Sequence, residues 1–122
     1  MANGKYPIHF FEIPVTKFER ARAFYEAVTT DRLDPMTMGD YQFGFFPRGE
    51  YVGGAIVQGE GYVPSQTGTL VYLNGSADFD AMLERVAACG GSVVMPRTAI
   101  GEHGSIARFI DTEGNMVAIH TM

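Results

Sequence analysis

The sequence predicts an α+β fold in which one domain, residues 1–122, contains two βαβββ modules. Two observations support this. Residues 16–28 and 78–89 both have apolar side chains at helical spacing, and each segment follows one β-favouring segment and precedes three more. The second helix also repeats the first at an offset of about half the chain, with Phe79 in the position of Phe18. Since such a unit cannot bury its sheet face alone, the modules are expected to pack together.

The first module is expected to cover about residues 7–59 and the second about residues 67–122, with a linker at residues 60–66. The linker is rich in Gly, Pro and Ser, which favour irregular structure over helices and strands. No composition shift elsewhere indicates a second domain, and the length suits one compact core.

The first strand is predicted at residues 8–15. Alternation places Phe10 and Glu12 on one face and Phe11 and Ile13 on the other. The following helix must bury its apolar stripe, and the Phe11 and Ile13 face is the nearest apolar surface. Glu12 is therefore expected on the opposite face of the sheet, where a carboxylate among apolar residues suggests a lined cavity.

The first helix is predicted to begin at Thr16, because Glu19 follows it at the capping-box spacing. The second helix is predicted to end at the glycine pair that follows Cys89. Residues 96–104 read as a loop, and residues 112–114 as the turn of a hairpin. The remaining strands are predicted around Met36 and Met38 and at residues 41–47, 51–58, 68–74, 92–95, 105–111 and 115–121.

Composition excludes several classes of protein. The net charge of −5 argues against nucleic-acid binding, which needs clustered Lys and Arg. No apolar run approaches the ~20 residues that cross a bilayer, so no membrane partner is expected. The N-terminus has no signal-peptide core, and Cys89 is the only cysteine, so we expect a cytoplasmic chain without a disulfide.

Three stretches give the chain a family resemblance: EIPVTKFERARAFYEAV, VYLNGSADFDAMLERVAACGGSVVMP and GSIARFIDTEGNMVAIH. Together they resemble the vicinal oxygen chelate superfamily, which includes glyoxalases, bleomycin-resistance proteins and extradiol dioxygenases. One departure is Lys17, where members often have Asp. The resemblance implies an open, U-shaped mixed sheet with helices on its convex side and a ligand in its concave cleft. It also implies a homodimer, because members commonly pair.

Metal-dependent members of this superfamily present His, Gln or Glu from four strands. The matching positions here are Phe10 on the first strand and Ala118 on the last, with the others near residues 54–56 and at Thr69 or Val71. None offers an imidazole or a carboxylate. The resemblance therefore implies a small-molecule-binding protein without a metal cofactor.

Two alternatives stay open at this point. Glu12 and His120 each lie two residues beyond a matching position, and with His103 they would form a displaced metal site. The chain would then resemble a metal-dependent glyoxalase-like lyase or isomerase, or a dioxygenase-related enzyme. Alternatively, Glu12, Arg108 and His120 would act as acid–base groups in a metal-free enzyme.

Arg108 enters this set through the hairpin. If Asp111 pairs with Asn115, Arg108 lies opposite Ala118 and points into the cleft. It would then bind an anion or bridge to Glu12, whereas another register would place it in solvent. The ligand-binding candidates are Phe10, Glu12, Tyr72, Arg108, Ala118 and His120. No residue is assigned as catalytic.

Overall fold

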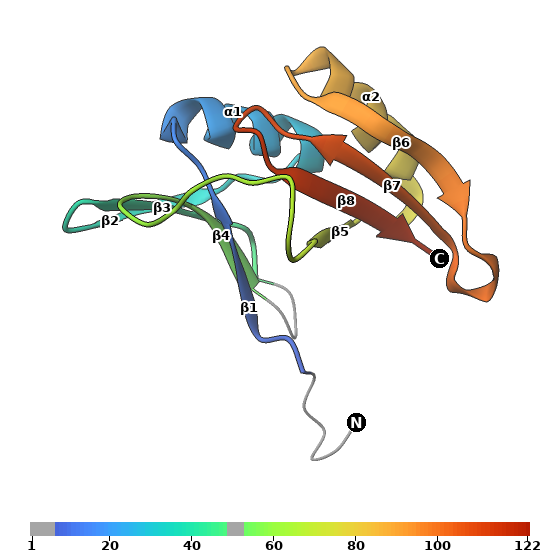
Figure 1. Ribbon diagram of the computed structural model, residues 1–122, viewed down its shortest axis with the longest axis horizontal. Coiled ribbons are helices and arrows are strands. Elements are labelled where there is room, and N and C mark those ends of the chain that lie inside the picture. The colour runs from blue at the N-terminus through green and yellow to red at the C-terminus, as the bar shows by residue number, and fades with distance from the viewer. Residues whose placement is uncertain (1–6, 49–52) are drawn as a thin grey trace.

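The computed structural model describes residues 7–48 and 53–122, and its element order confirms the two βαβββ modules (Figure 1). The two helices are α1 (Phe18–Thr29) and α2 (Phe79–Ala88). The strands are β1 (Phe10–Pro14), β2 (Asp34–Met38), β3 (Tyr41–Phe45), β4 (Gly53–Gln58), β5 (Tyr72–Asn74), β6 (Ser92–Ala99), β7 (Ser105–Ile110) and β8 (Met116–Thr121). Residues 51 and 52 of the predicted fourth strand lie outside the described residues.

Each module forms one four-stranded mixed sheet, and the strand order repeats. The first sheet runs β1-β4-β3-β2 and the second β5-β8-β7-β6. In each, the first and last strands of the module pair in parallel and the other pairs are antiparallel. Figure 1 shows the two sheets side by side in an open arrangement, not a closed barrel. The shared strand order supports the duplication expected from the sequence.

Both modules contribute to one apolar core, which lies between the helices and the sheets. Phe18, Phe24 and Val28 of α1 join Phe79 and Val86 of α2 in this core. The core also takes alternate residues from the strands: Ile13, Ile56, Leu73, Ala107, Phe109, Val117 and Ile119. The helices therefore cover one face of the sheets and leave the opposite, concave face free of them.

The predicted alternation in β1 is confirmed. Ile13 is 3% exposed and Phe11 packs against the core, whereas Phe10 is 43% exposed and Glu12 is exposed on the other face. Sequence alternation alone thus identified which side chains of β1 line the concave face.

The predicted cap of α1 is wrong. The helix begins at Phe18, and Lys17 takes the N-cap position without a capping side chain. Instead, the Glu113 carboxylate accepts hydrogen bonds from the backbone N–H groups of Thr16 and Lys17, at 2.9 and 2.8 Å. The Phe18 N–H, which the Thr16 hydroxyl was expected to satisfy, donates instead to the side-chain oxygen of Gln58 at 2.6 Å. A carboxylate from the second module thus takes the role that Glu19 was expected to have toward the Thr16 N–H.

Two strand boundaries also differ from the prediction. β6 continues to Ala99 instead of ending at Met95, with register shifts on either side of Met95, the second of which contains Pro96. A proline fits there because β6 is an edge strand, where a missing N–H costs no ladder bond. β5 begins only at Tyr72 instead of at Gly68, and the Ser65 hydroxyl holds a turn at residues 65–67 just before the predicted start.

Candidate functional site

The concave face of the first sheet carries a row of aromatic rings. The strand register places Phe10 beside Gly53, and Phe45 opposite Ala55. These small neighbours leave room for the rings, and Phe10 lies 3.4 Å from the position of a Cβ on Gly53. The Phe43 and Phe45 rings stack with their centroids 5.6 Å apart, and the Phe10 ring is 6.3 Å from Phe45. We call Phe10, Phe43 and Phe45 the aromatic array.

A cavity of about 380 Å³ opens beside the aromatic array, so two of its rings are accessible from outside. Its polar groups are the side chains of Arg32, Asp34 and Arg48. The residues that line it are Phe10, Arg32, Asp34, Phe45, Phe46, Pro47, Arg48, Gly53 and Gly54. Apolar walls with a few polar groups are typical of small-molecule sites.

Glu12 lies on the same face and is held by the linker. The Tyr62 hydroxyl donates a hydrogen bond of 2.9 Å to the Glu12 carboxylate. This hydrogen bond raises the pKa of Tyr62 above its ordinary value. The Tyr62 ring also meets the Tyr41 ring edge-on at 6.0 Å. Glu12 is therefore engaged by Tyr62 and forms no ion pair with Arg108 among the described residues.

The concave face of the second sheet contains Arg108, as the hairpin register predicted. Asp111 pairs with Asn115, and Arg108 lies directly opposite Ala118. Met95 flanks Arg108 on β6, and Tyr72 flanks Ala118 on β5, so one row crosses the whole sheet. The Nε atom of Arg108 is buried and has no hydrogen-bond partner among the described residues.

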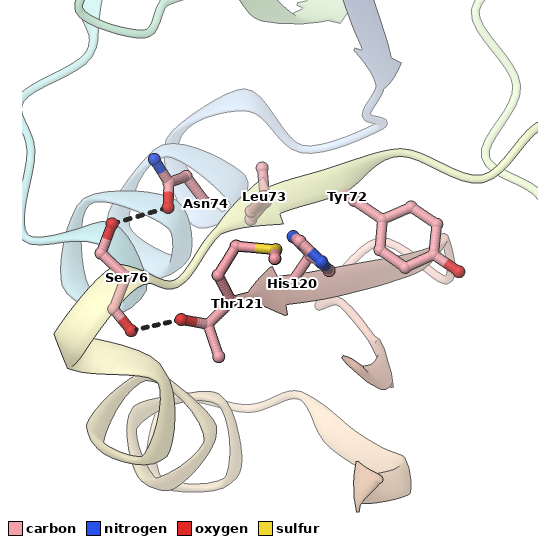
Figure 2. A pocket seen from close by; sticks show the side chains of 7 residues that line it. Tyr72, Leu73, Asn74, Ser76, His120 and Thr121 are labelled. Carbon is pink, nitrogen blue, oxygen red and sulfur yellow. Dashed lines mark hydrogen bonds between the residues drawn. The ribbon is translucent and has the colours of Figure 1, made fainter. Parts of the chain in front are cut away.

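His120 borders a second cavity, of about 450 Å³, at the end of β5 and β8 (Figure 2). Its Nε2 atom lies 2.6 Å from the backbone oxygen of His103. Because a carbonyl oxygen only accepts, Nε2 carries the proton and Nδ1 of the neutral ring is an acceptor. The cavity is lined by Tyr72, Leu73, Asn74, Ser76, His120, Thr121 and Met122.

The structure brings the sequence-predicted residues together in two groups. Tyr72, Arg108, Ala118 and His120 share the face of the second sheet, and Ala118 is completely buried there. Phe10 and Glu12 share the face of the first sheet. No hydrogen bond joins Glu12, Arg108 and His120 to one another among the described residues, so no acid–base pair forms between them.

The side chains in the cleft do not fit a divalent cation. Phe10 and Ala118 occupy two of the positions where metal-dependent members carry ligands, and Gly54, Ala55 and Ile56 are all buried and lack donor side chains. Within residues 7–48 and 53–122, no three His, Cys, Asp or Glu side chains gather closely enough to hold a metal ion. The displaced site of Glu12, His103 and His120 is therefore not assembled.

Sequence reasoning missed two parts of this site. Phe43 was not singled out, although the YQFGF stretch alternates aromatic residues with small or polar ones and places Tyr41, Phe43 and Phe45 on one face. Tyr62 lay in the predicted linker, and nothing in the sequence indicated that the linker reaches back to Glu12.

No helix in the described part of the chain is long and apolar enough to cross a membrane.

Comparisons with solved structures support the same architecture. A glyoxalase/bleomycin resistance protein from Albidiferax ferrireducens T118 is 15% identical and matches with a TM-score of 0.76, covering 96% of this chain and 99% of that chain. The fosfomycin resistance protein FosX from Mesorhizobium loti is 25% identical, with a TM-score of 0.63 over 93% of this chain and 89% of that chain. TnmS3, an antibiotic binding protein from Streptomyces sp. CB03234, is 22% identical, with a TM-score of 0.69 over 97% of each chain.

A comparison with curated protein sequences gives no match. The family model described as the glyoxalase/bleomycin resistance protein/dioxygenase superfamily matches residues 7–119, which is nearly the whole chain. The repeated βαβββ order and the open pair of sheets agree with that match. The chain therefore belongs to the glyoxalase/bleomycin resistance protein/dioxygenase superfamily.

Proposed function

We propose that this protein binds a small organic molecule in its concave cleft without a metal ion. The aromatic array is the observation that carries this proposal, because one of its rings, that of Phe10, takes a position where metal-dependent members of the superfamily place a ligand. The same fold supports an antibiotic binding protein, TnmS3, so binding without catalysis is a role that the fold can serve.

The array suits the flat face of a planar apolar ligand. Two of its rings are stacked nearly parallel, with an interplanar angle of 5°, and Phe10 is 43% exposed. Aromatic pairs contribute about 0.5–1.5 kcal/mol beyond the area that they bury. A planar ligand that stacks on this row would gain such contacts and would also shield apolar surface from water.

The test is calorimetric titration of a panel of neutral bicyclic and tricyclic compounds, with 2-naphthamide included. Phe45→Leu keeps the apolar volume but removes the central ring, so we expect affinity to fall about 3- to 10-fold. Val94→Ala is the matched control, because Val94 is an exposed apolar side chain on the other sheet and should leave affinity unchanged. Failure of the wild type to bind any of the panel, or equal affinities in all three proteins, would contradict the proposal.

We also propose that the protein works as an isologous homodimer, as the family resemblance implies. Four of the exposed large apolar side chains lie on the concave faces of the two sheets: Phe10, Met36, Met38 and Tyr72. Exposed apolar surface favours an interface, and a two-fold pair would bury the same surface on each copy. Light scattering at high micromolar concentration should give the mass of a dimer, and a monomer mass would refute this.

A further inference from the structure

We infer that Arg108 anchors a carboxylate subsite on the second sheet. The ligand bound there would be an apolar molecule that carries one carboxylate. This inference rests on the proposed function and specifies the ligand class. It begins from the buried Nε atom of Arg108, which has no hydrogen-bond partner among the described residues. Buried polar atoms in native proteins are nearly always paired, so an orphaned donor on a ligand-binding face calls for an explanation.

The surroundings of Arg108 contain no anion from the second sheet itself. The strand register places Tyr72, Met95, Ile106, Ile110, Met116 and Ala118 on its face of the sheet. The other side chain there that can become positive is His120, and none of the strand residues on this face is a carboxylate. Arg108 is half-buried and forms no ion pair among the described residues, and a bound carboxylate would supply the missing anionic partner.

The charge on this face of the second sheet differs from that on the first. The chain has a net charge of −5, and the strands of the first sheet carry two carboxylates on the matching face, Glu12 and Asp34. The cavity beside the first sheet has both signs of charge, because Arg32 and Arg48 line it together with Asp34. The positive charge of Arg108 would attract an anionic ligand to the second sheet.

The row of side chains that crosses the sheet gives Arg108 uncharged neighbours. Ala118 lies between Arg108 and Tyr72 and is completely buried, whereas Arg108 is half-buried and Tyr72 is exposed. A guanidinium is a planar fork that matches the two oxygens of a carboxylate. The neighbouring Met95 and Ile106 would then pack on the apolar body of the ligand.

The test compares 2-naphthoate with 2-naphthamide, its neutral counterpart, by calorimetric titration. We expect the wild type to bind the carboxylate at least about 10-fold more tightly. Arg108→Gln should lower affinity for 2-naphthoate about 10- to 100-fold and leave affinity for 2-naphthamide unchanged. Arg97→Gln is the matched control, because Arg97 pairs with Asp80 and lies over the Phe79 ring on the helix side. It removes the same charge and should change neither affinity.

A stability measurement separates ligand binding from a structural role. Arg108→Met removes the orphaned donor and keeps the apolar stem, so its melting temperature should equal or exceed that of the wild type. A large fall in melting temperature would make Arg108 structural and would overturn the inference.

The remaining outcomes separate this inference from the proposed function. If the wild type binds 2-naphthoate and 2-naphthamide equally, or if Arg108→Gln binds 2-naphthoate as the wild type does, the carboxylate subsite is refuted while the binding function stands. If the wild type binds neither compound and none of the neutral panel, both are refuted. Loss of 2-naphthoate affinity in Arg108→Gln but not in Phe45→Leu would support the subsite and count against the aromatic array.

Discussion

Replacing Glu113 with glutamine removes the charge that links the second module to the first turn of α1. One carboxylate oxygen accepts hydrogen bonds from the backbone of Thr16 and Lys17, and the other accepts a hydrogen bond of 2.7 Å from Nε of Arg20. The Glu113 side chain is fully buried. A negative charge at a helix N-terminus is also favoured by the helix dipole. The substitution therefore weakens a contact between segments that are far apart in the chain, with sequence separations of 93 to 97.

The magnitude follows from the pKa of Glu113. Burial by itself raises this pKa, but hydrogen bonds from Arg20, Lys17, Thr16 and Thr112 outweigh burial and lower it from 4.5 to about 2. Each unit of pKa corresponds to about 1.4 kcal/mol, so the ionised form stabilises the fold by about 3 kcal/mol. Arg20 is 44% exposed, so solvent screens its share, and the backbone donors supply much of the rest.

The pH dependence has a defined sign. Because the folded pKa lies below the unfolded value of 4.5, the stabilisation is complete above pH 4.5 and is lost as the pH falls toward 2. The amide of the substituted side chain can still accept from the backbone but cannot ionise, so Glu113→Gln should lose about 2 kcal/mol at pH 7. The difference between the two proteins should shrink as the pH falls toward 2.

Urea unfolding, followed by circular dichroism at pH 7 and at several values down to 2.5, measures both effects. Glu84→Gln is the control, because Glu84 is exposed on α2 and should change stability by less than about 0.5 kcal/mol. The reasoning is refuted if Glu113→Gln matches the control at pH 7, or if its difference from the wild type does not depend on pH.

Two further predictions concern the buried network and the absence of a metal. Tyr25→Phe removes the 2.5 Å hydrogen bond that the buried Tyr25 hydroxyl donates to Asp111, so urea unfolding should show a loss of about 1–2 kcal/mol; an unchanged midpoint would show that Asp111 is satisfied without it. A chelator should leave the melting temperature unchanged, because a ligand stabilises only a state that binds it, and mass spectrometry should find less than one tightly bound divalent ion per chain. Stoichiometric zinc, nickel or iron, with a lower melting temperature after chelation, would instead support a metal-dependent enzyme.

Periodicity in the sequence was enough to predict the elements and their faces. Alternation placed Phe11 and Ile13 in the core and Phe10 and Glu12 on the concave face, as the structure confirms. The short turn after Asp111 fixed the hairpin register, and with it the position of Arg108 opposite Ala118. These predictions succeed because strand alternation and short turns depend on residues close together in the chain.

The contacts that join distant segments could not be predicted in the same way. The sequence offered Thr16 as a local cap, but Glu113 approaches α1 only after the two modules pack together. The hydrogen bond from Tyr62 to Glu12 likewise forms only once the linker has folded back onto β1. The stacking of Phe43 on Phe45 depends on the side-chain packing of the folded sheet. The sequence by itself determined the order of elements, the repeat and the lack of metal-binding side chains at the matching positions. Only the tertiary structure decided which groups the cleft contains, because long-range packing positions them.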